Sequence, residues 1–314
     1  MRVVSVDTIH PILFSQLEGA GHEVVDVSQL NDSEMLLALE NADGIVMRSR
    51  LDVDSKFIND HLKLKFIGRV GSGLENVDQI ATDSNDVVVF TSPEGNRDSV
   101  AEHALAMLLA WLNNIVQANS QVKGGQWERN LNKGEELKGK TVALIGYGNT
   151  GSAFAKLLLG FGVRVLAYDK YRKDFKETAI EEVSMGEIYR DADVVSLHIP
   201  LNDETNYLVN QEWLASFSKP IVLINTSRGK IVQTDALITG LQKGQLRGCC
   251  LDVLEYENAR LKMPDFSTLP SALNELLSND RVILSPHCAG LSPESYYKLS
   301  EVMANKIIQR FGRA

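Results

Sequence analysis

Three side chains that could perform acid, base or anion chemistry each come shortly after an apolar, β-rich run in the second half of the chain. They are Arg228, Glu257 and His287. If these runs are parallel strands, polar residues beyond their carboxyl ends face one crevice. An arginine fork binds a carboxylate and an adjacent carbonyl, and a histidine exchanges protons near neutral pH. Beside a hydride acceptor, this set can oxidise a 2-hydroxy acid.

The carboxylate next to the imidazole would fix the histidine tautomer. Two glutamates in the same short run, Glu255 and Glu257, can take this role. We assign it to Glu257, and Glu255 stays open as the alternative.

A glycine motif nearer the middle of the chain indicates the hydride acceptor. Residues 146–151 read GYGNTG, between an apolar run and a helix-compatible stretch. Gly146 permits a tight turn, Gly148 lets backbone amides approach a pyrophosphate, and Gly151 lets the helix pack on the strand. Asp169, at the end of the next apolar run, would accept hydrogen bonds from the adenosine ribose. This order predicts an NAD site, and an ordinary turn is the alternative.

The elements that position these residues follow a repeating strand and helix pattern, which predicts an α/β fold. Continuous apolar runs suit strands covered on both faces. At 314 residues, two domains are expected. The expected strands are residues 3–6, 23–27, 44–47, 66–70 and 87–90, and then 141–145, 163–168, 194–198, 221–225, 248–253 and 282–285. The last six form a doubly wound sheet with the glycine motif after its first strand.

Two long helices are predicted. Residues 99–122 form a single helix that is apolar on nearly every side, and residues 293–310 form a tail helix that packs on the first domain. A helix that is apolar all round must be buried. We expect it between domains or at a subunit interface, and the second position would make the protein a homodimer. Burial within one subunit is the alternative.

Composition limits the partners. The net charge of −9 argues against nucleic acid or acidic membranes as partners. The first residues read as a strand rather than a signal peptide, so a cytoplasmic protein is expected. The longest strongly apolar stretch, residues 104–112, is too short to cross a bilayer. The cysteines form no disulfide framework, and we expect no metal site.

With these residues in view, the chain resembles the D-isomer-specific 2-hydroxyacid dehydrogenase family over essentially its whole length. The stretches that carry the resemblance are 71–78, 99–103, 146–151 with Asp169, 225–229, 251–253 and 285–287. The resemblance implies that Arg228 binds the substrate carboxylate, that His287 is the acid and base, and that Glu257 is its partner. In the family a proline commonly follows this glutamate, but this chain has Asn258, so the choice between the two glutamates is less secure.

The resemblance also implies an architecture and a cofactor site. A Rossmann-type NAD domain, residues 98–287, is inserted into a flavodoxin-like substrate domain made of residues 1–97 and 288–314. The residues implied along the NAD site are Gly146, Gly148, Asn149, Thr150, Gly151, Asp169, His198, Ile199, Pro200, Thr226, Ser227, Asp252 and Gly290.

Within the family, the chain is most similar to the branch that oxidises 3-phosphoglycerate to 3-phosphohydroxypyruvate in serine biosynthesis. Arg48 and Arg69 each end a predicted strand of the first domain, and two guanidinium groups suit a phosphate. The predicted substrate residues are Arg48, Ser49, Arg69, Ser72 and Gly73. The alternatives are a hydroxypyruvate or glyoxylate reductase, and a non-catalytic protein that senses NAD.

Overall fold

The chain divides into two compact units, each built on a parallel sheet. The computed structural model describes residues 1–312 except 176–178, 259 and 262. Unit 1 comprises Met1–Arg97, Asn258–Lys262 and Leu291–Ala314, and unit 2 comprises Asp98–Glu257 and Met263–Gly290. Both sheets alternate with helices, which confirms the predicted α/β fold class.

Unit 1 has a five-stranded sheet in the order β2-β1-β3-β4-β5, which is the flavodoxin-like order. The strands are β1 Arg2–Ser5, β2 Glu23–Asp26, β3 Gly44–Met47, β4 Phe66–Arg69 and β5 Val88–Thr91. The helices are α1 Ile12–Gly19, α2 Asp32–Leu39, α3 Ser55–Asp60, α4 Gln79–Ser84 and α12 Pro293–Phe311.

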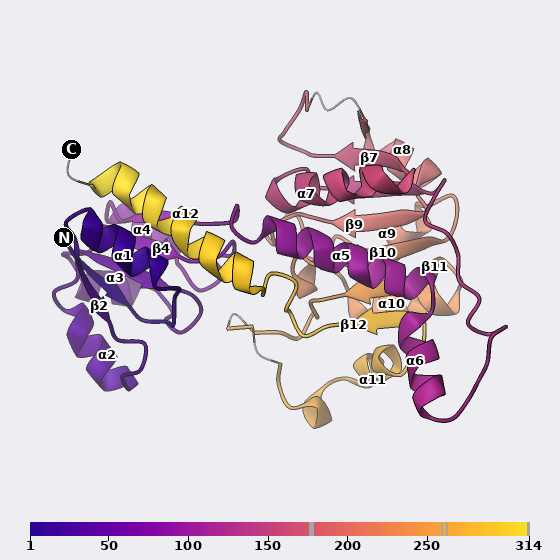
Figure 1. The fold of residues 1–314 in the computed structure, drawn as a ribbon, viewed down its shortest axis with the longest axis horizontal. Coiled ribbons are helices and arrows are strands. Elements are labelled where there is room, and N and C mark those ends of the chain that lie inside the picture. The colour runs from indigo at the N-terminus through magenta and orange to yellow at the C-terminus, as the bar shows by residue number, and fades with distance from the viewer. Residues whose placement is uncertain (176–178, 259, 262, 313–314) are drawn as a thin grey trace. The chain divides into compact units, whose positions relative to one another are not determined.

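Both faces of this sheet are covered. The neighbouring residues Val3 and Val4 of β1 are fully buried in two different apolar clusters. One cluster includes side chains from α2, α3 and α4, and the other includes side chains from α1 and α12. Helix α12 lies against α1, as Figure 1 shows, so the predicted packing of the tail helix on the first domain is observed.

Unit 2 has a seven-stranded sheet in the order β12-β11-β10-β9-β6-β7-β8. The strands are β6 Thr141–Ile145, β7 Arg164–Tyr168, β8 Ile180–Glu182, β9 Val194–Leu197, β10 Ile221–Asn225, β11 Leu246–Leu251 and β12 Val282–Leu284. The order reverses at β6, so ligands are expected beyond the carboxyl ends near this strand. Strand β8 was not predicted, because it has three residues and two of them are exposed glutamates.

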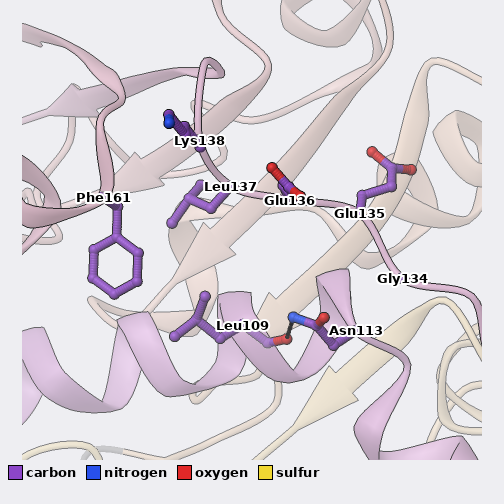
Figure 2. A pocket seen from close by; sticks show the side chains of 8 residues that line it. All are labelled: Leu109, Asn113, Gly134, Glu135, Glu136, Leu137, Lys138 and Phe161. Atoms are coloured by element: carbon purple, nitrogen blue, oxygen red, sulfur yellow. Dashed lines mark hydrogen bonds between the residues drawn. The ribbon is translucent and has the colours of Figure 1, made fainter.

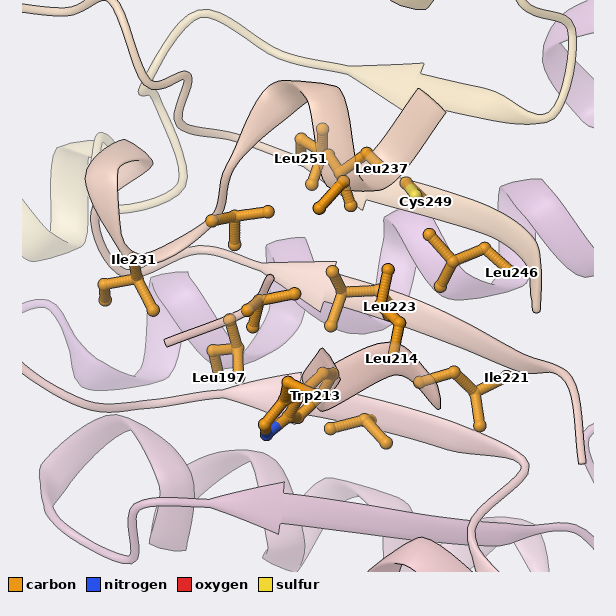
Figure 3. Packing of buried hydrophobic residues seen from close by; sticks show 14 of the residues in the cluster. Leu197, Trp213, Leu214, Ile221, Leu223, Ile231, Leu237, Leu246, Cys249 and Leu251 are labelled. Atoms are coloured by element: carbon orange, nitrogen blue, oxygen red, sulfur yellow. The ribbon is translucent and has the colours of Figure 1, made fainter. Parts of the chain in front are cut away.

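The helices of unit 2 cover both sheet faces. They are α5 Arg97–Leu112, α6 Ile115–Lys123, α7 Asn149–Leu158, α8 Met185–Asp191, α9 Gln211–Ala215, α10 Thr234–Gln242 and α11 Ser271–Leu277, with short 3-10 turns η1 Leu159–Phe161, η2 Gly229–Ile231 and η3 Phe266–Thr268. Figure 3 shows the core on one face, where Trp213 and Leu214 of α9 pack on strand residues such as Leu223. Cys249 belongs to this core and Cys250 to the core beneath α5 and α7.

The predicted single helix over residues 99–122 was wrong, because it is broken at Asn113 and Asn114. Asn114 has φ 52°, a left-handed conformation that ends the helix. The Asn113 side chain turns back to donate a hydrogen bond to the Leu109 carbonyl at 3.0 Å (Figure 2). Asparagine favours both features because its short amide hydrogen-bonds nearby backbone.

The break also changes where apolar residues are exposed. The residues of α5 that point inward, including Ala104 and Leu108, are buried in the core of unit 2. This is the alternative of burial within one subunit. In contrast, α6 has no buried residue, and its Ile115 and Val116 are more than half exposed.

The predicted domain boundaries differ from the observed units in two places. Residues 258–262 belong to unit 1, where Arg260 forms an ion pair with Asp52 at 2.7 Å. Residues 288–290 belong to unit 2, because Asp252 accepts hydrogen bonds from the backbone of Cys288 and Ala289.

The described residues contain no single helix that is both long and apolar enough to cross a membrane. Helices α5 and α6 meet that test only when they are taken together, and they are bent by 63° at the break.

Candidate active site

Arg228, Glu257 and His287 all lie beyond the carboxyl ends of adjacent strands in unit 2. They follow β10, β11 and β12, which are neighbours in the sheet. The carboxyl ends of parallel strands share one edge of the sheet, so this topology brings three segments that are distant in sequence to the same edge.

The His287 imidazole is hydrogen-bonded to the Glu257 carboxylate. His287 Nδ1 and Glu257 Oε2 are 2.5 Å apart, and both side chains are largely buried. The second oxygen, Glu257 Oε1, accepts the backbone N–H of Leu254 at 2.5 Å. A carboxylate only accepts hydrogen bonds, so Nδ1 carries the hydrogen and Nε2 is the nitrogen left to exchange a proton.

Glu255, the alternative partner of the histidine, faces another part of unit 2. Its carboxylate accepts the Tyr207 hydroxyl at 2.9 Å and the backbone N–H of Thr234, the first residue of α10, at 2.8 Å. The hydrogen bond to Glu255 raises the pKa of Tyr207, and burial adds to this effect. The structure therefore brings Glu257, and not Glu255, to His287.

The backbone at His287 has an unusual conformation that the neighbouring Asp252 maintains. His287 has φ 52°, a left-handed value that costs a residue with a side chain about 1–3 kcal/mol. Its N–H donates to the Asp252 carbonyl at 2.7 Å. The Asp252 carboxylate, which is 1% exposed, accepts the Ser285 hydroxyl at 2.6 Å and the N–H groups of Cys288 and Ala289 at 2.9 Å each. Residues on both sides of His287 are thus fixed to one buried carboxylate.

The turn that carries Arg228 is equally constrained. Asn225, at the end of β10, donates to the Arg228 carbonyl at 3.0 Å and accepts the Ser227 N–H at 3.0 Å. Arg228 Nη1 donates to the Ser227 carbonyl at 2.7 Å. At Gly229, a Cβ atom would lie 1.9 Å from the Leu254 carbonyl oxygen. The Arg228 turn therefore packs directly against the segment that leads to Glu257, and this contact requires glycine.

The glycine motif after β6 has the geometry of a phosphate-binding turn. Gly146 has φ 97°, and a Cβ atom at Gly151 would lie 2.2 Å from the Gly146 carbonyl oxygen. Gly148 precedes α7, and a Cβ atom built there meets nothing within 4 Å. Open space at the N-terminus of a helix suits a pyrophosphate. Thr226 Oγ1, also beyond the strand ends, is buried without a hydrogen-bond partner among the described residues. These features fit a dinucleotide.

Asp169, at the end of β7, accepts three backbone hydrogen bonds. The donors are the N–H groups of Tyr147 at 2.8 Å and of Tyr171 and Arg172 at 2.9 Å. Burial opposes the charged form, but these hydrogen bonds outweigh it and lower the pKa of Asp169. The carboxylate is therefore charged at neutral pH beside the glycine motif. The Arg172 side chain is bound to the Tyr147 carbonyl at 2.8 Å.

The buried His198 side chain contacts the glycine motif at Thr150. Its ring lies within hydrogen-bond distance of Ser196 Oγ (2.9 Å) and of Thr150 Oγ1 (3.2 Å). Burial lowers its pKa to about 3, so the ring is neutral at physiological pH. Of the other predicted cofactor residues, Asn149 begins α7, Ile199 and Pro200 directly follow His198, Ser227 is bound to the Leu197 carbonyl, and Gly290 ends unit 2.

The predicted substrate residues belong to unit 1 and lie at or beyond the carboxyl ends of β3 and β4. These strands are adjacent, with Met47 in register with Arg69. The backbone N–H of Arg48 donates to Asp7 at 2.6 Å, and the Arg48 guanidinium has no acidic partner among the described residues of unit 1. Arg69 is 8% exposed and donates to the Val70 carbonyl at 3.1 Å.

Three other predicted residues lie close by in the sequence. Ser49 directly follows Arg48, the Ser72 hydroxyl lies 3.4 Å from Asn96 Oδ1, and Gly73 is buried. The structure places them along the same strand ends as Arg48 and Arg69.

The comparisons with known proteins fit this geometry. Residues 105–289 match the pattern described as "D-isomer specific 2-hydroxyacid dehydrogenase, NAD binding domain". The chain belongs to this family. Residues 105–289 are thus an NAD-binding domain, and the predicted family and cofactor are confirmed.

Relatives with different names match more than nine-tenths of the chain. D-3-phosphoglycerate dehydrogenase of Methanocaldococcus jannaschii is 32% identical over 310 residues, which are 98% of this chain and 57% of that protein. Hydroxypyruvate reductase of Thermotoga maritima is 31% identical over 288 residues, which are 92% of this chain and 91% of the reductase. The chain spans little more than half of the phosphoglycerate dehydrogenase.

Solved structures agree on the fold. The D-lactate dehydrogenase of Aquifex aeolicus, solved with NAD and lactic acid, has a TM-score of 0.80 and 28% identity, covering 99% of this chain and 96% of that one.

A surface hollow of about 410 Å³ lies elsewhere in unit 2, at the end of α5. Leu109, Leu137 and Phe161 form its apolar walls, as Figure 2 shows. Glu135, on its rim, is bound to Lys140 and Arg247. The hollow contains none of the predicted catalytic residues.

Sequence reasoning missed several residues that hold the site together. The sequence indicates Asn225, Gly229 and Ser285 only as parts of motifs, and it predicts no more for His103 than packing within its helix. An asparagine directly before a turn is a recognisable signal, because its side chain bonds backbone two residues on. The close approach at Gly229 has no local signal, since the backbone that it meets belongs to the segment after another strand.

The low pKa of His198 predicts a pH dependence of stability. Unfolding restores its pKa to about 6.5. Between about pH 6.5 and pH 3, the unfolded chain therefore binds a proton at His198 and the folded protein does not. The free energy of unfolding should fall as the pH falls through this window, with a contribution of up to about 1.4 kcal/mol per pH unit. His198→Gln should remove this part of the slope.

All three tryptophans lie in unit 2, so their fluorescence during urea unfolding at several pH values measures the effect. An unchanged slope in the variant would contradict the assignment.

Proposed function

We propose that the protein interconverts a D-2-hydroxy acid and its 2-oxo acid with NAD as the hydride carrier. The observation that supports this most is the His287–Glu257 hydrogen bond, at the same sheet edge as Arg228 and the NAD-binding turn. This gives a proton-exchanging group and an anion-binding group beside the place for a hydride carrier.

The residues of this chain divide the work. Arg228 binds the substrate carboxylate and polarises the adjacent oxygen with its charged N–H groups. In the oxidative direction, His287 Nε2 takes the hydroxyl proton, and in the reductive direction it returns a proton to the forming alkoxide. Glu257 keeps the imidazole oriented. The bound nicotinamide supplies hydride transfer between its ring and the substrate C2.

The cofactor is held by its phosphates and its ribose. Backbone N–H groups of Asn149 and Thr150, at the start of α7, bind the pyrophosphate. The charged Asp169 accepts hydrogen bonds from the ribose and repels a 2′-phosphate, which favours NAD over NADP. Arg172, which could soften this preference, is bound to the Tyr147 carbonyl.

The substrate that we propose is 3-phosphoglycerate, with 3-phosphohydroxypyruvate as product, in serine biosynthesis. The support is the Arg48 guanidinium, which has no acidic partner among the described residues, while its neighbour Arg50 is bound to Asp32 and to backbone carbonyls. Arg69, Ser49, Ser72 and Gly73 would complete the substrate site of unit 1. A hydroxypyruvate or glyoxylate reductase is the second candidate, supported by the identity to the Thermotoga reductase.

A homodimer is proposed through α6, which is the second part of the helix first expected at the interface, and through the chain after it. Large apolar side chains are exposed along residues 115–131, including Ile115 (53%), Val116 (57%), Trp127 (76%) and Leu131 (68%). In Figure 1, the chain after α6 extends away from the sheet of unit 2. A run of exposed apolar residues on one protruding segment suits a second copy of the chain, since a closed dimer buries it twice.

The test of the reaction is NADH consumption with a panel of 2-oxo acids, with and without a phosphate. His287→Gln should lower kcat by about 100- to 10,000-fold, because the proton transfer is lost, and should leave NADH binding intact. Glu257→Gln should also lower kcat, whereas Glu255→Gln is the matched control and should not. Negligible turnover of every acid, together with NADH-dependent oligomerisation, would instead favour the NAD-sensing alternative.

Arg48→Ala tests the substrate. The KM for 3-phosphohydroxypyruvate should rise about 10- to 100-fold, because one or two charge-assisted hydrogen bonds are lost. The KM for hydroxypyruvate should not change, and neither KM should change in Lys56→Ala, an exposed cation of the same unit. An equal loss on both acids would argue against a phosphate site.

Trp127→Ser tests the dimer. Sedimentation velocity should show a dimer for the original protein and a shift toward monomer for the variant, since a large buried aromatic anchor is removed. Leu62→Ser, at an 82% exposed leucine of unit 1, is the control and should stay dimeric. A monomeric original protein would refute the proposal.

A further inference from the structure

Helix α5 carries two polar side chains, one helical turn apart, that contact the segment around His287. Ser99 Oγ donates to the Ala289 carbonyl at 2.8 Å, and His103 Nε2 lies 2.8 Å from Ser285 Oγ. Residues four apart on a helix share one face. The two contacts therefore hold the His287 segment on both sides of the imidazole, at residues 285 and 289.

The direction of the hydrogen bonds can be assigned. A serine hydroxyl has one proton, and the charged Asp252 Oδ1 at 2.6 Å is the strongest acceptor near Ser285. Ser285 Oγ must then accept from His103, so His103 has its hydrogen on Nε2. A continuous chain of hydrogen bonds runs from His103 through Ser285 to Asp252.

This chain ends at the backbone of the candidate catalytic residue. Asp252 binds the N–H groups of Cys288 and Ala289 through its carboxylate and that of His287 through its carbonyl. His287 is in the left-handed conformation, φ 52°, which a free segment would leave. The contact of its Nδ1 with Glu257 depends on that backbone being held.

The position of the two contacts along the chain adds to their importance. The chain first passes into unit 2 at Asp98 and leaves it for the last time at Gly290. Ser99 and Ala289 each lie next to one of these two crossings. Their hydrogen bond ties the first and the last of these crossings to each other within unit 2.

We propose that Ser99 and His103 are positioning residues that hold His287 in register with Glu257 and with the substrate. They act through the backbone of residues 285–289 and touch neither substrate nor cofactor. The proposal rests on the reaction proposed above, and it gives a role to the 99–103 stretch, which that reaction leaves without one.

The same neighbourhood could suit a cation, because ligand atoms of His103, Asp252 and Cys288 lie within 4.8 Å of one another. Two observations favour the hydrogen-bonded arrangement. His103 Nε2 is occupied by its hydrogen bond to Ser285, and the Asp252 carboxylate already accepts three hydrogen bonds. Assays with EDTA present keep metal binding out of the measurement.

The test compares two replacements of the histidine in the full-length protein. His103→Leu keeps bulk and removes the donor, whereas His103→Gln keeps an N–H near the position of Nε2. For His103→Leu, kcat should fall about 10- to 100-fold at an unchanged KM for the oxo acid, because Arg228 still binds the carboxylate while His287 is misplaced. His103→Gln should recover most of the activity. Glu102→Gln, at an exposed residue of the same turn, is the control.

A double variant separates positioning from simple stability. Because His103 acts through Ser285, His103→Leu combined with Ser285→Ala should lose no more kcat than the more damaged single variant. Three results would overturn the proposal. One is a double variant in which the kcat losses of the two single variants multiply. The others are a wild-type kcat in His103→Leu and a loss in His103→Gln as large as that in His103→Leu. Ser99→Ala should lower kcat as well, and an unchanged value would overturn the role of Ser99.

A spectroscopic measurement tests the positioning role of His103 even if the protein turns over no oxo acid. In nitrogen-15 NMR of histidine-labelled protein, His287→Gln identifies the His287 signals. The Nδ1 hydrogen bonded to Glu257 should disappear or shift in His103→Leu and persist in His103→Gln. If no oxo acid is turned over by the original protein, the proposed reaction fails, and this measurement alone judges the positioning role. An unchanged His287 spectrum in His103→Leu overturns it.

Discussion

The buried carboxylate of Asp252 organises the carboxyl edge of the sheet in unit 2. A charged group at 1% exposure is stable only when its oxygens are fully hydrogen-bonded, and here three protein donors meet it. Two of them are the backbone N–H groups directly after His287. The cost of burying the charge is therefore offset by interactions that fix one particular backbone path. Without this carboxylate, the segment that follows the left-handed His287 would lose the two hydrogen bonds that fix its backbone.

Close approach of backbone segments is the second constraint on the site. At Gly151 the first turn of α7 meets the Gly146 carbonyl, and at Gly229 the Arg228 turn meets the Leu254 carbonyl. Neither position has room for a Cβ atom. The first contact holds the open space at Gly148 near the strand end, and the second holds the arginine turn against the glutamate segment. Only the second contact joins segments that follow separate strands, β10 and β11, and it does so through backbone atoms.

Much of this arrangement could be predicted from the sequence, because it follows from strand ends. The apolar runs before Arg228 and His287 indicate in the local sequence that each residue follows a strand. Because the carboxyl ends of parallel strands share one edge of the sheet, this predicts that the two residues lie close together. The choice between Glu255 and Glu257 could not be made locally, since both carboxylates lie in one turn and the difference depends on Thr234 and Tyr207. The end of α5 was not predicted for a related reason. The apolar pattern continues past Asn113 and Asn114, and only the backbone conformation at these residues shows that the helix ends there. The contact of His103 with Ser285 spans most of unit 2, so no short sequence pattern carries it.

The packing of α12 on unit 1 has a consequence for the way the chain is made. Its side chains, including Leu299, Met303 and Ile307, cover the sheet face that contains Val3 and Phe66. A ribosome must complete all of unit 2 before α12 emerges, which takes on the order of tens of seconds at ordinary elongation rates. During that interval only α1 covers this face of the sheet in unit 1, and apolar side chains that α12 later covers remain exposed. The unit synthesised first is thus the one that finishes folding last.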